Sequence, residues 1–218
     1  MTMSESILRQ RHSVRSFLDK PIDNETIQSI IADAHLAPSW CNTQPWKVYI
    51  ATGNLAKKLC KTHYDNTLHT QSWCEIPPPQ DNDWNTTTAV NRQGWFHTIA
   101  SLDNKNKTAL FDMNSNNFNA PVIIYITAPA KATAYSYYDI GAFGYGITLS
   151  AYEHNIGSIP AYEFIRYPHE IRAVFDIPED EKILLGIGLG YPDDHPINSI
   201  HRTTGRVPIE SMMTIKEN

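Results

Sequence analysis

The chain has 218 residues, 41% of them hydrophobic, and a formal net charge of −5. Its length fits one large domain, residues 1–218, with a sizeable core. The acidic balance argues against nucleic-acid binding, because phosphate backbones need a basic surface. No apolar run is long enough to span a membrane, and the N-terminus lacks the apolar region of a signal peptide. The three cysteines have no metal-type spacing, so we expect free thiols in the cytoplasm and no metal site.

The first third of the chain predicts three helices and one strand. A short helix starts at Ser4 and ends near residue 11, and the stretch SVRSF after it is extended. A second helix starts at Asp23 or Asn24 and ends before Pro38, because its apolar residues recur at helical spacing. Residues 46–51 alternate as in a strand, and residues 55–63 form a third helix. The apolar face of the second helix consists of Ile27, Ile30, Ile31 and Ala34.

The middle of the chain, about residues 63–119, breaks this pattern. It contains three consecutive prolines, 77–79, and many asparagines. A structureless loop of this length is unusual, so we expect some helix here, with residues 95–102 as the candidate. We interpret the segment as an excursion over the body of the domain, or as a lid.

The last part of the chain predicts two strands, at 122–127 and 182–189, and a long helix over 135–155 with Gly157 as its C′ residue. Pro168 opens a further helix over 169–175. The tail after residue 191 is polar and extended. Helices thus alternate with few strands, which predicts an α+β fold with a small central antiparallel or mixed sheet.

Two stretches have the side chains of a ligand site. RQRHSVRS places Arg9, Arg11 and Arg15 around Ser13, and arginine forks match phosphate oxygens. The alternative is a solvated helix end whose dipole favours cations. APSWCNTQPWKVYI crowds Ser39, Asn42, Thr43 and Gln44 before an apolar run, and amide side chains suit a flavin or nucleobase edge. The alternative is a polar turn.

The glycine-rich stretches have a structural explanation. GIGLGYP is not a dinucleotide loop, because its glycines lie inside a strand and no helix follows at Pro192. We expect these glycines to permit close backbone approach. Gly141, Gly144 and Gly146 lie in the long helix, where each costs roughly 1 kcal/mol against alanine. We expect close packing there, within the monomer, against a partner helix or against a flat ligand.

Taken together, the chain resembles the FMN-dependent nitroreductase family in four blocks that occur in the family's order. The first is RHSVRSF and the second is APSWCNTQPWKVYI. The third is the glycine-bearing helix with GSIPAYE after it, and the fourth is GLGYPDDHPIN followed by GRVPIE. The middle segment, about 63–119, does not match.

The resemblance implies an intertwined homodimer with two FMN molecules at its interface. Arg11, Ser13 and Arg15 would hold the phosphate and ribityl end, with His12 contributing backbone, and Arg206 would return to the same phosphate. Pro38, Ser39, Asn42 and Gln44 would come from the other subunit. The stretch Ile159-Pro160-Ala161 would pass the ring edge. Pro160 has no N–H, so Ala161 or Tyr162 would donate to flavin N5.

The implied activity is hydride transfer from NADH or NADPH, through flavin N5, to a nitroaromatic or quinone acceptor with ping-pong kinetics. The cofactor performs the chemistry, so no catalytic side chain is required. Alternatives are an FMN-binding module without turnover, another flavin-dependent dehydrogenase, or a flavin-consuming enzyme on the same fold. A protein without flavin would make the order of the four blocks a coincidence.

Overall fold

The computed structural model describes residues 6–203 and 205–217, without the side chains of residues 201–203. It contains one antiparallel sheet in the order β1-β2-β4-β3. The strands are β1 (Lys47–Thr52), β2 (Val122–Pro129), β3 (Gly157–Ala161) and β4 (Glu181–Gly190). The two central strands, β2 and β4, come from segments predicted to be strands, so the α+β class with a small central sheet is confirmed.

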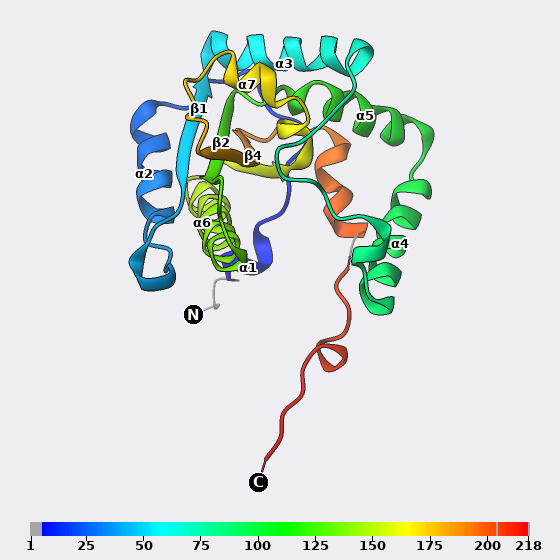
Figure 1. Cartoon of the computed structure of the whole chain (residues 1–218). Coiled ribbons are helices and arrows are strands. Elements are labelled where there is room, and N and C mark those ends of the chain that lie inside the picture. The colour runs from blue at the N-terminus through cyan, green and yellow to red at the C-terminus, as the bar shows by residue number, and fades with distance from the viewer. Residues whose placement is uncertain (1–5, 204, 218) are drawn as a thin grey trace, which may run out of the picture.

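Helices cover both faces of this sheet (Figure 1). The helices are α1 (Ile7–Gln10), α2 (Asn24–Ala34), α3 (Gly53–His69), α4 (Thr86–Ala100), α5 (Asn104–Ser115), α6 (Ala134–Glu153) and α7 (Pro168–Arg172). Short 3-10 turns include η1 (Trp40–Asn42), η3 (Asn117–Asn119), η4 (Tyr162–Ile165) and η5 (Pro196–Thr203). No helix among the described residues is long and apolar enough to cross a membrane.

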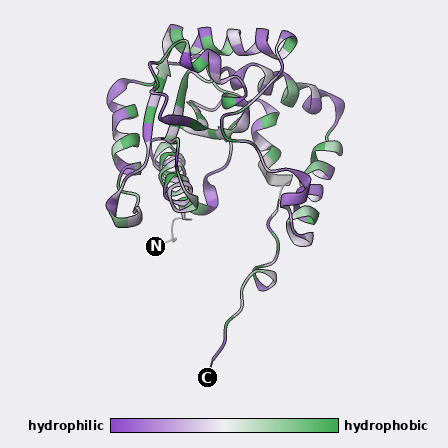
Figure 2. Cartoon of the chain, in the orientation of Figure 1, coloured by the Kyte–Doolittle hydropathy of each residue, from purple (hydrophilic) through white to green (hydrophobic). Residues whose placement is uncertain are grey.

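The alternation along β2 divides the core into two layers. Ile124 and Ile126 pack with α2 and α6, whereas Ile123 and Tyr125 pack with α3 and the segment around Phe164. Both faces of the strand are therefore buried, which explains its continuous apolar run. α2 and α3 show alternating hydrophobic and hydrophilic stripes in Figure 2, as expected of helices with one face on a core.

Several predicted boundaries are wrong. Ser6 rather than Ser4 caps α1, with its Oγ accepting from Leu8 N, and Ser4 lies outside the described residues. Gly157 is not a C′ residue but the first residue of β3. Asn155, with φ of 58°, takes the left-handed position after α6 instead. α3 runs to His69, six residues beyond its predicted end, and α7 ends at Arg172.

The middle segment contains the helices α4 and α5, so the expectation of some helix in it is confirmed. The predicted helix over 95–102 was placed too late and made too short, because α4 begins at Thr86. Asn85 and Asp103 cap the two helices with their side chains, accepting from Thr88 N and Asn106 N. The two helices lie to one side of the sheet in Figure 1, next to the tail.

The glycines of β4 make room for aromatic side chains rather than for the close backbone approach that was predicted. A Cβ at Gly186 would lie 2.1 Å from Phe164 Cβ, and one at Gly190 would lie 2.7 Å from Phe17 Cδ1. In α6, a Cβ at Gly146 would lie 3.1 Å from Ala34 Cα of α2, so this helix pair packs closely. Gly141 differs, because its Cβ would meet nothing within 4 Å.

Candidate functional site

The arginine-bearing stretch is held in place by residues nearly two hundred positions away. Asn198 Oδ1 accepts from the backbone N–H groups of Arg15 (2.7 Å) and Ser16 (3.0 Å), and its Nδ2 donates to Ser16 O (2.9 Å). Ser16 Oγ donates to Asp193 Oδ2 at 2.5 Å. The segment DDHPIN thus fixes the backbone from which Arg11, Ser13 and Arg15 project.

The same stretch also joins the free edge of β3. Ser13 and Ser158 form a parallel bridge, in which Val14 N–H donates to Ser158 O at 2.9 Å. The first, third and fourth of the sequence blocks therefore meet at one place in the fold. The sequence alone does not show that these blocks meet, because they are far apart in the chain and are joined by a β-bridge and by tertiary hydrogen bonds.

Beside this junction lies a cavity of about 980 Å³. Arg9, Arg11, His12, Ser13 and Arg15 line one side of it, and Gly205, Arg206 and Val207 of the tail line another. The structure thus brings together the five residues that the family resemblance assigns to one end of a cofactor: Arg11, His12, Ser13, Arg15 and Arg206. Its size lies at the upper end of the range for small-molecule sites.

The arginines of this cavity have no carboxylate partner among the described residues. Arg11 Nε is buried without a hydrogen-bond acceptor there, and the Arg11 guanidinium lies 5.7 Å from the Tyr145 ring centroid. Arg15 Nη1 donates to Ser13 O at 3.2 Å, and burial lowers the pKa of Arg15 from its usual range. Buried charge without a counter-charge is unfavourable, so the cavity is suited to an anion.

The third wall of the cavity was missed by sequence reasoning. It is one face of α4, formed by Val90, Asn91, Gly94, Trp95 and Thr98. None of the residues of α4 is buried. The helix therefore shows little of the apolar periodicity by which a helix facing a core is recognised, and its face toward the cavity mixes apolar and polar residues. Only the spacing of Val90, Gly94 and Thr98 at intervals of four hints at a shared face.

The backbone of β3 determines which N–H groups face away from the sheet. Because Ser158 O bonds to Val14, Ser158 and its partner Leu189 form a non-hydrogen-bonded pair across the two strands. Pairs alternate along an antiparallel ladder, so Pro160 also occupies a non-bonded position, where its missing N–H costs nothing. Ala161 N–H then faces β4, and the next outward-facing amide belongs to Tyr162. Ile159 is buried, Pro160 is exposed and Ala161 is partly exposed.

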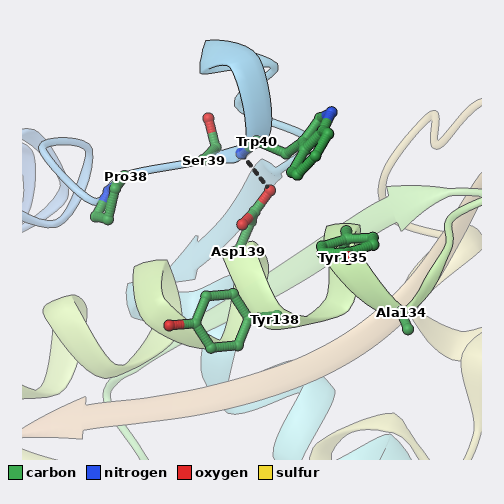
Figure 3. A pocket seen from close by; sticks show the side chains of 7 residues that line it. All are labelled: Pro38, Ser39, Trp40, Ala134, Tyr135, Tyr138 and Asp139. Atoms are coloured by element: carbon green, nitrogen blue, oxygen red, sulfur yellow. Dashed lines mark hydrogen bonds between the residues drawn. The ribbon is translucent and has the colours of Figure 1, made fainter.

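The polar stretch between α2 and β1 lies at a different cavity (Figure 3). This cavity of about 500 Å³ is lined by Pro38, Ser39 and Trp40 together with Ala134, Tyr135, Tyr138 and Asp139 of α6. Asp139 Oδ2 accepts from Trp40 N–H at 2.9 Å and so ties the loop to α6. Of the predicted cofactor residues, Pro38 and Ser39 line this second cavity and not the arginine cavity. Within one chain, neither cavity is lined by Asn42, Gln44, Ile159, Pro160 or Ala161.

The loop has a strained backbone. Cys41, Asn42 and Gln44 have φ values of 47°, 58° and 46°, which non-glycine residues rarely adopt. Ser39 Oγ accepts from Gln44 N–H (3.0 Å), and Gln44 Nε2 donates to Asn42 O (3.0 Å). Asn42 is exposed and Gln44 is partly exposed, so the single chain does not bury these amides. Strain of this kind is typical of ligand-binding segments.

The fold is α+β, and an arginine-lined cavity suited to an anion lies beside the junction of Ser13 with the edge strand β3. A strained polar loop lies elsewhere on the surface. This arrangement is that of a small-ligand-binding protein whose site is built from segments distant in the sequence. The comparisons with known proteins identify the class further. The family model described as the nitroreductase family matches residues 8–191. The chain belongs to the nitroreductase family.

Named relatives and solved structures agree with this membership. A 4-nitrobenzoate reductase from Pseudomonas putida is 28% identical over 207 residues, which covers 90% of this chain and 88% of the relative. Nitroreductase NfnB from Mycolicibacterium smegmatis is 25% identical over 198 residues, covering 88% and 83%. A crystal structure of the FMN-dependent nitroreductase NfnB from Mycobacterium smegmatis in complex with NADPH superimposes with a TM-score of 0.85 at 22% identity, covering 97% of this chain and 96% of that one.

Proposed function

We propose that the protein is an FMN-dependent oxidoreductase that passes hydride from NADH or NADPH to a nitroaromatic or quinone-type acceptor. When bound, the flavin supplies the redox chemistry at its N5 atom. One observation carries the proposal: in a chain of the nitroreductase family, arginines without a carboxylate partner among the described residues converge on one cavity. The same cavity is lined by Ser13, which bridges to Ser158 of β3. The residues of the chain bind and orient the reactants.

The donor set fits a flavin mononucleotide. Its terminal phosphate carries up to two negative charges, and Arg11, Arg15 and Arg206 offer guanidinium forks that match phosphate oxygens. The buried Nε of Arg11 has no acceptor among the described residues, and a phosphate or ribityl oxygen would supply one. Ser13 adds a hydroxyl, and His12 adds backbone groups to the same wall.

The exposed edge of β3 supports the assignment of the ring end. The outward-facing amide after Pro160 is that of Tyr162, so we assign the hydrogen bond to flavin N5 to Tyr162 N–H rather than to Ala161 N–H. Ile159, Pro160 and Ala161 would then lie along the ring edge. This arrangement requires no side-chain acid or base, and none is proposed.

We further propose that the active unit is a homodimer. The exposed face of α6 carries Tyr138, which is 75% exposed, and Tyr145, which is 43% exposed, with the open side of Gly141 between them. The tail of 205–217 runs away from the body in Figure 1 and exposes Val207, Ile209 and Met212. A second copy covering these surfaces would bring Pro38, Ser39, Asn42 and Gln44 to the other chain's flavin and would bury the strained loop.

Cys41, Cys60 and Cys74 are all free thiols, which supports the cytoplasm as the compartment. The protein would work there on a small-molecule acceptor.

The test is the visible spectrum and mass of the purified protein, followed by heat release of the chromophore. We expect FMN near one per chain, a dimer in solution, and oxidation of NADH or NADPH when a nitroaromatic or a quinone is added. Parallel double-reciprocal lines would fit the ping-pong scheme. A protein that is colourless and takes up no added FMN would refute the proposal. FMN binding without turnover of any acceptor would favour a flavin-binding module instead.

A further inference from the structure

A fully buried histidine joins three elements beside the end of β3. His63 of α3 is 0% exposed. Its Nε2 lies 3.1 Å from Glu163 Oε1 of η4, and its Nδ1 lies 3.1 Å from Glu170 Oε1 of α7. Glu163 is the residue directly after Tyr162, whose amide faces out from the sheet edge.

The geometry of this cluster fits a protonated histidine between two ionised carboxylates. An ionised carboxylate only accepts hydrogen bonds, so both contacts are satisfied only when both ring nitrogens of His63 carry protons. Each carboxylate also accepts a hydrogen bond from a second side chain: Arg166 Nη1 lies 2.7 Å from Glu163 Oε1, and Asn66 Nδ2 lies 2.8 Å from Glu170 Oε2. We therefore assign a buried imidazolium between two carboxylates.

The local pKa shift agrees with this assignment. Burial by itself lowers the pKa of His63, but hydrogen bonds and charges from Glu163 and Glu170 outweigh it, and the net effect raises the pKa. The carboxylates approach opposite ring nitrogens, so the cluster is not shaped to surround an ion. Among the described residues, no group of three or more His, Cys, Asp or Glu side chains could hold a metal ion.

The position of η4 depends on this cluster from one side and on the core from the other. Phe164 is fully buried against the space left by Gly186 and Gly188. Glu163 points instead to His63 and to Arg166. Cys74 Sγ adds a third contact, because it donates to Ile165 O of η4 at 3.4 Å and lies against the Tyr162 side chain. Burial raises the pKa of Cys74 and raises that of Tyr162 to about 12, so the ionic contact of Glu163 with His63 is the one expected to respond first as the pH rises.

We propose that His63 is a positioning residue, whose imidazolium holds η4 so that the Tyr162 amide is presented to the flavin. The inference rests on the proposed FMN site but does not require His63 to touch FMN. It assigns a role to a buried titratable group that the hydride transfer itself does not use.

When His63 loses one proton, one ring nitrogen presents a lone pair to a carboxylate, and this contact becomes repulsive. The Glu163 side chain is 14% exposed and that of Glu170 is 1% exposed, so Glu163 is the one that can turn to water, and η4 would move with it. The other groups facing the cluster are Arg166, which directly follows η4, Tyr167 against the ring, Cys60 of α3 and the buried Tyr125 of β2. Burial raises the pKa of both Cys60 and Tyr125, so neither is expected to titrate before His63.

The sign of the effect follows from linkage. A histidine whose pKa is raised by folding contributes stability that is complete below its unfolded pKa and is lost as the pH rises through its folded pKa. FMN affinity should therefore fall as the pH rises through the folded pKa of His63, and we call this fall the alkaline limb. Removing one carboxylate should lower the pKa of His63 and shift this limb to lower pH.

The experiment is FMN titration by flavin fluorescence as a function of pH in the wild type, Glu170→Gln and His63→Gln. Glu170→Gln keeps the shape of the side chain and touches neither η4 nor the proposed flavin site. Hydrogen exchange of the backbone over 157–166 in the FMN-free proteins gives a second readout. Thr127→Val is the matched control, because it removes a buried donor to another carboxylate, that of Glu181, far along the sheet.

We expect Glu170→Gln to shift the alkaline limb to lower pH, and His63→Gln to weaken FMN binding roughly 10-fold or more with no such limb. Exchange over 157–166 should accelerate at the same pH as the limb, and Thr127→Val should leave it in place. Identical pH profiles for the wild type and Glu170→Gln would overturn the role of His63 while leaving FMN binding intact. A wild type that binds no FMN would instead refute the proposed function, and hydrogen exchange would still show whether η4 responds to His63.

Discussion

The most direct prediction concerns Arg11 and Arg206, which come from opposite ends of the chain to one cavity. We expect Arg11→Ala and Arg206→Ala each to weaken FMN binding without unfolding the monomer. Arg206 is exposed and its guanidinium donates only to the neighbouring Gly205 O among the described residues. Arg11 has a buried Nε without an acceptor there. Neither side chain therefore stabilises the fold through an ion pair.

The magnitude follows from the donors involved. A hydrogen bond to a charged group contributes about 1.5–3 kcal/mol, and about 1.4 kcal/mol corresponds to tenfold in affinity. Each arginine should thus account for roughly 10- to 100-fold in the dissociation constant of FMN. Arg11 should lie at the upper end, because burial reduces the screening of its charge by water and salt.

The assay is a fluorescence titration of FMN into the FMN-free variants at two salt concentrations, with urea unfolding as the check on stability. Lys57→Ala is the matched control. It removes the same single positive charge from an exposed pair with Asp19, away from the cavity, and should leave FMN affinity unchanged. If both arginine variants retain FMN as tightly as Lys57→Ala does, the phosphate assignment is wrong.

Three further predictions concern the body of the fold. Gly186→Ala should destabilise the protein by about 1–3 kcal/mol or more in urea unfolding, because its Cβ would lie 2.1 Å from Phe164 Cβ, whereas Gly94→Ala, with open space around it, should cause no loss. Cys60, whose pKa burial raises to about 12, should resist alkylation at pH 9 until urea unfolds the chain, as followed by mass spectrometry; fast labelling of the native protein would contradict this. Burial alone would raise the pKa of Glu181, but hydrogen bonds from Lys47, Thr127 and Tyr49 outweigh it and lower the pKa. The contribution of Glu181 to stability should therefore be lost as the pH falls below about 4.5 and through the folded pKa. Glu181→Gln should flatten the dependence of the free energy of unfolding on pH in this range, and an unchanged dependence would exclude the cluster as its cause.

Three strands could be predicted from the sequence because their residues carry the pattern by themselves. β3 could not, since GSIPA starts with a glycine and contains a proline, both of which normally argue against a strand. The structure shows why the proline is tolerated: Pro160 lies at a non-bonded position on the sheet edge, where no N–H is needed. The exception is informative, because the same alternation leaves the Tyr162 amide facing outward.

The excursion was harder to predict for a different reason. α5 buries only Leu110 and α4 buries nothing among its residues, so neither helix displays a clear apolar face. The caps Asn85 and Asp103 were the available signal, but a segment rich in asparagine offers many such candidates. What α4 faces is the arginine cavity, and a helix selected to line a cavity has no reason to show the periodicity of a core helix.

The candidate site shows the same division between local and distant information. The residue types of RHSVRSF indicate anion binding, but the backbone from which they project is fixed by Asn198 and Asp193, through hydrogen bonds that no local pattern encodes. The loop around Asn42 depends on information that a single chain does not contain, because its side-chain amides are not buried within one chain. Its left-handed backbone is unfavourable for non-glycine residues, and contacts with a ligand and a second copy would offset that cost. The proposed dimer with bound flavin would therefore account for the strain at Cys41, Asn42 and Gln44.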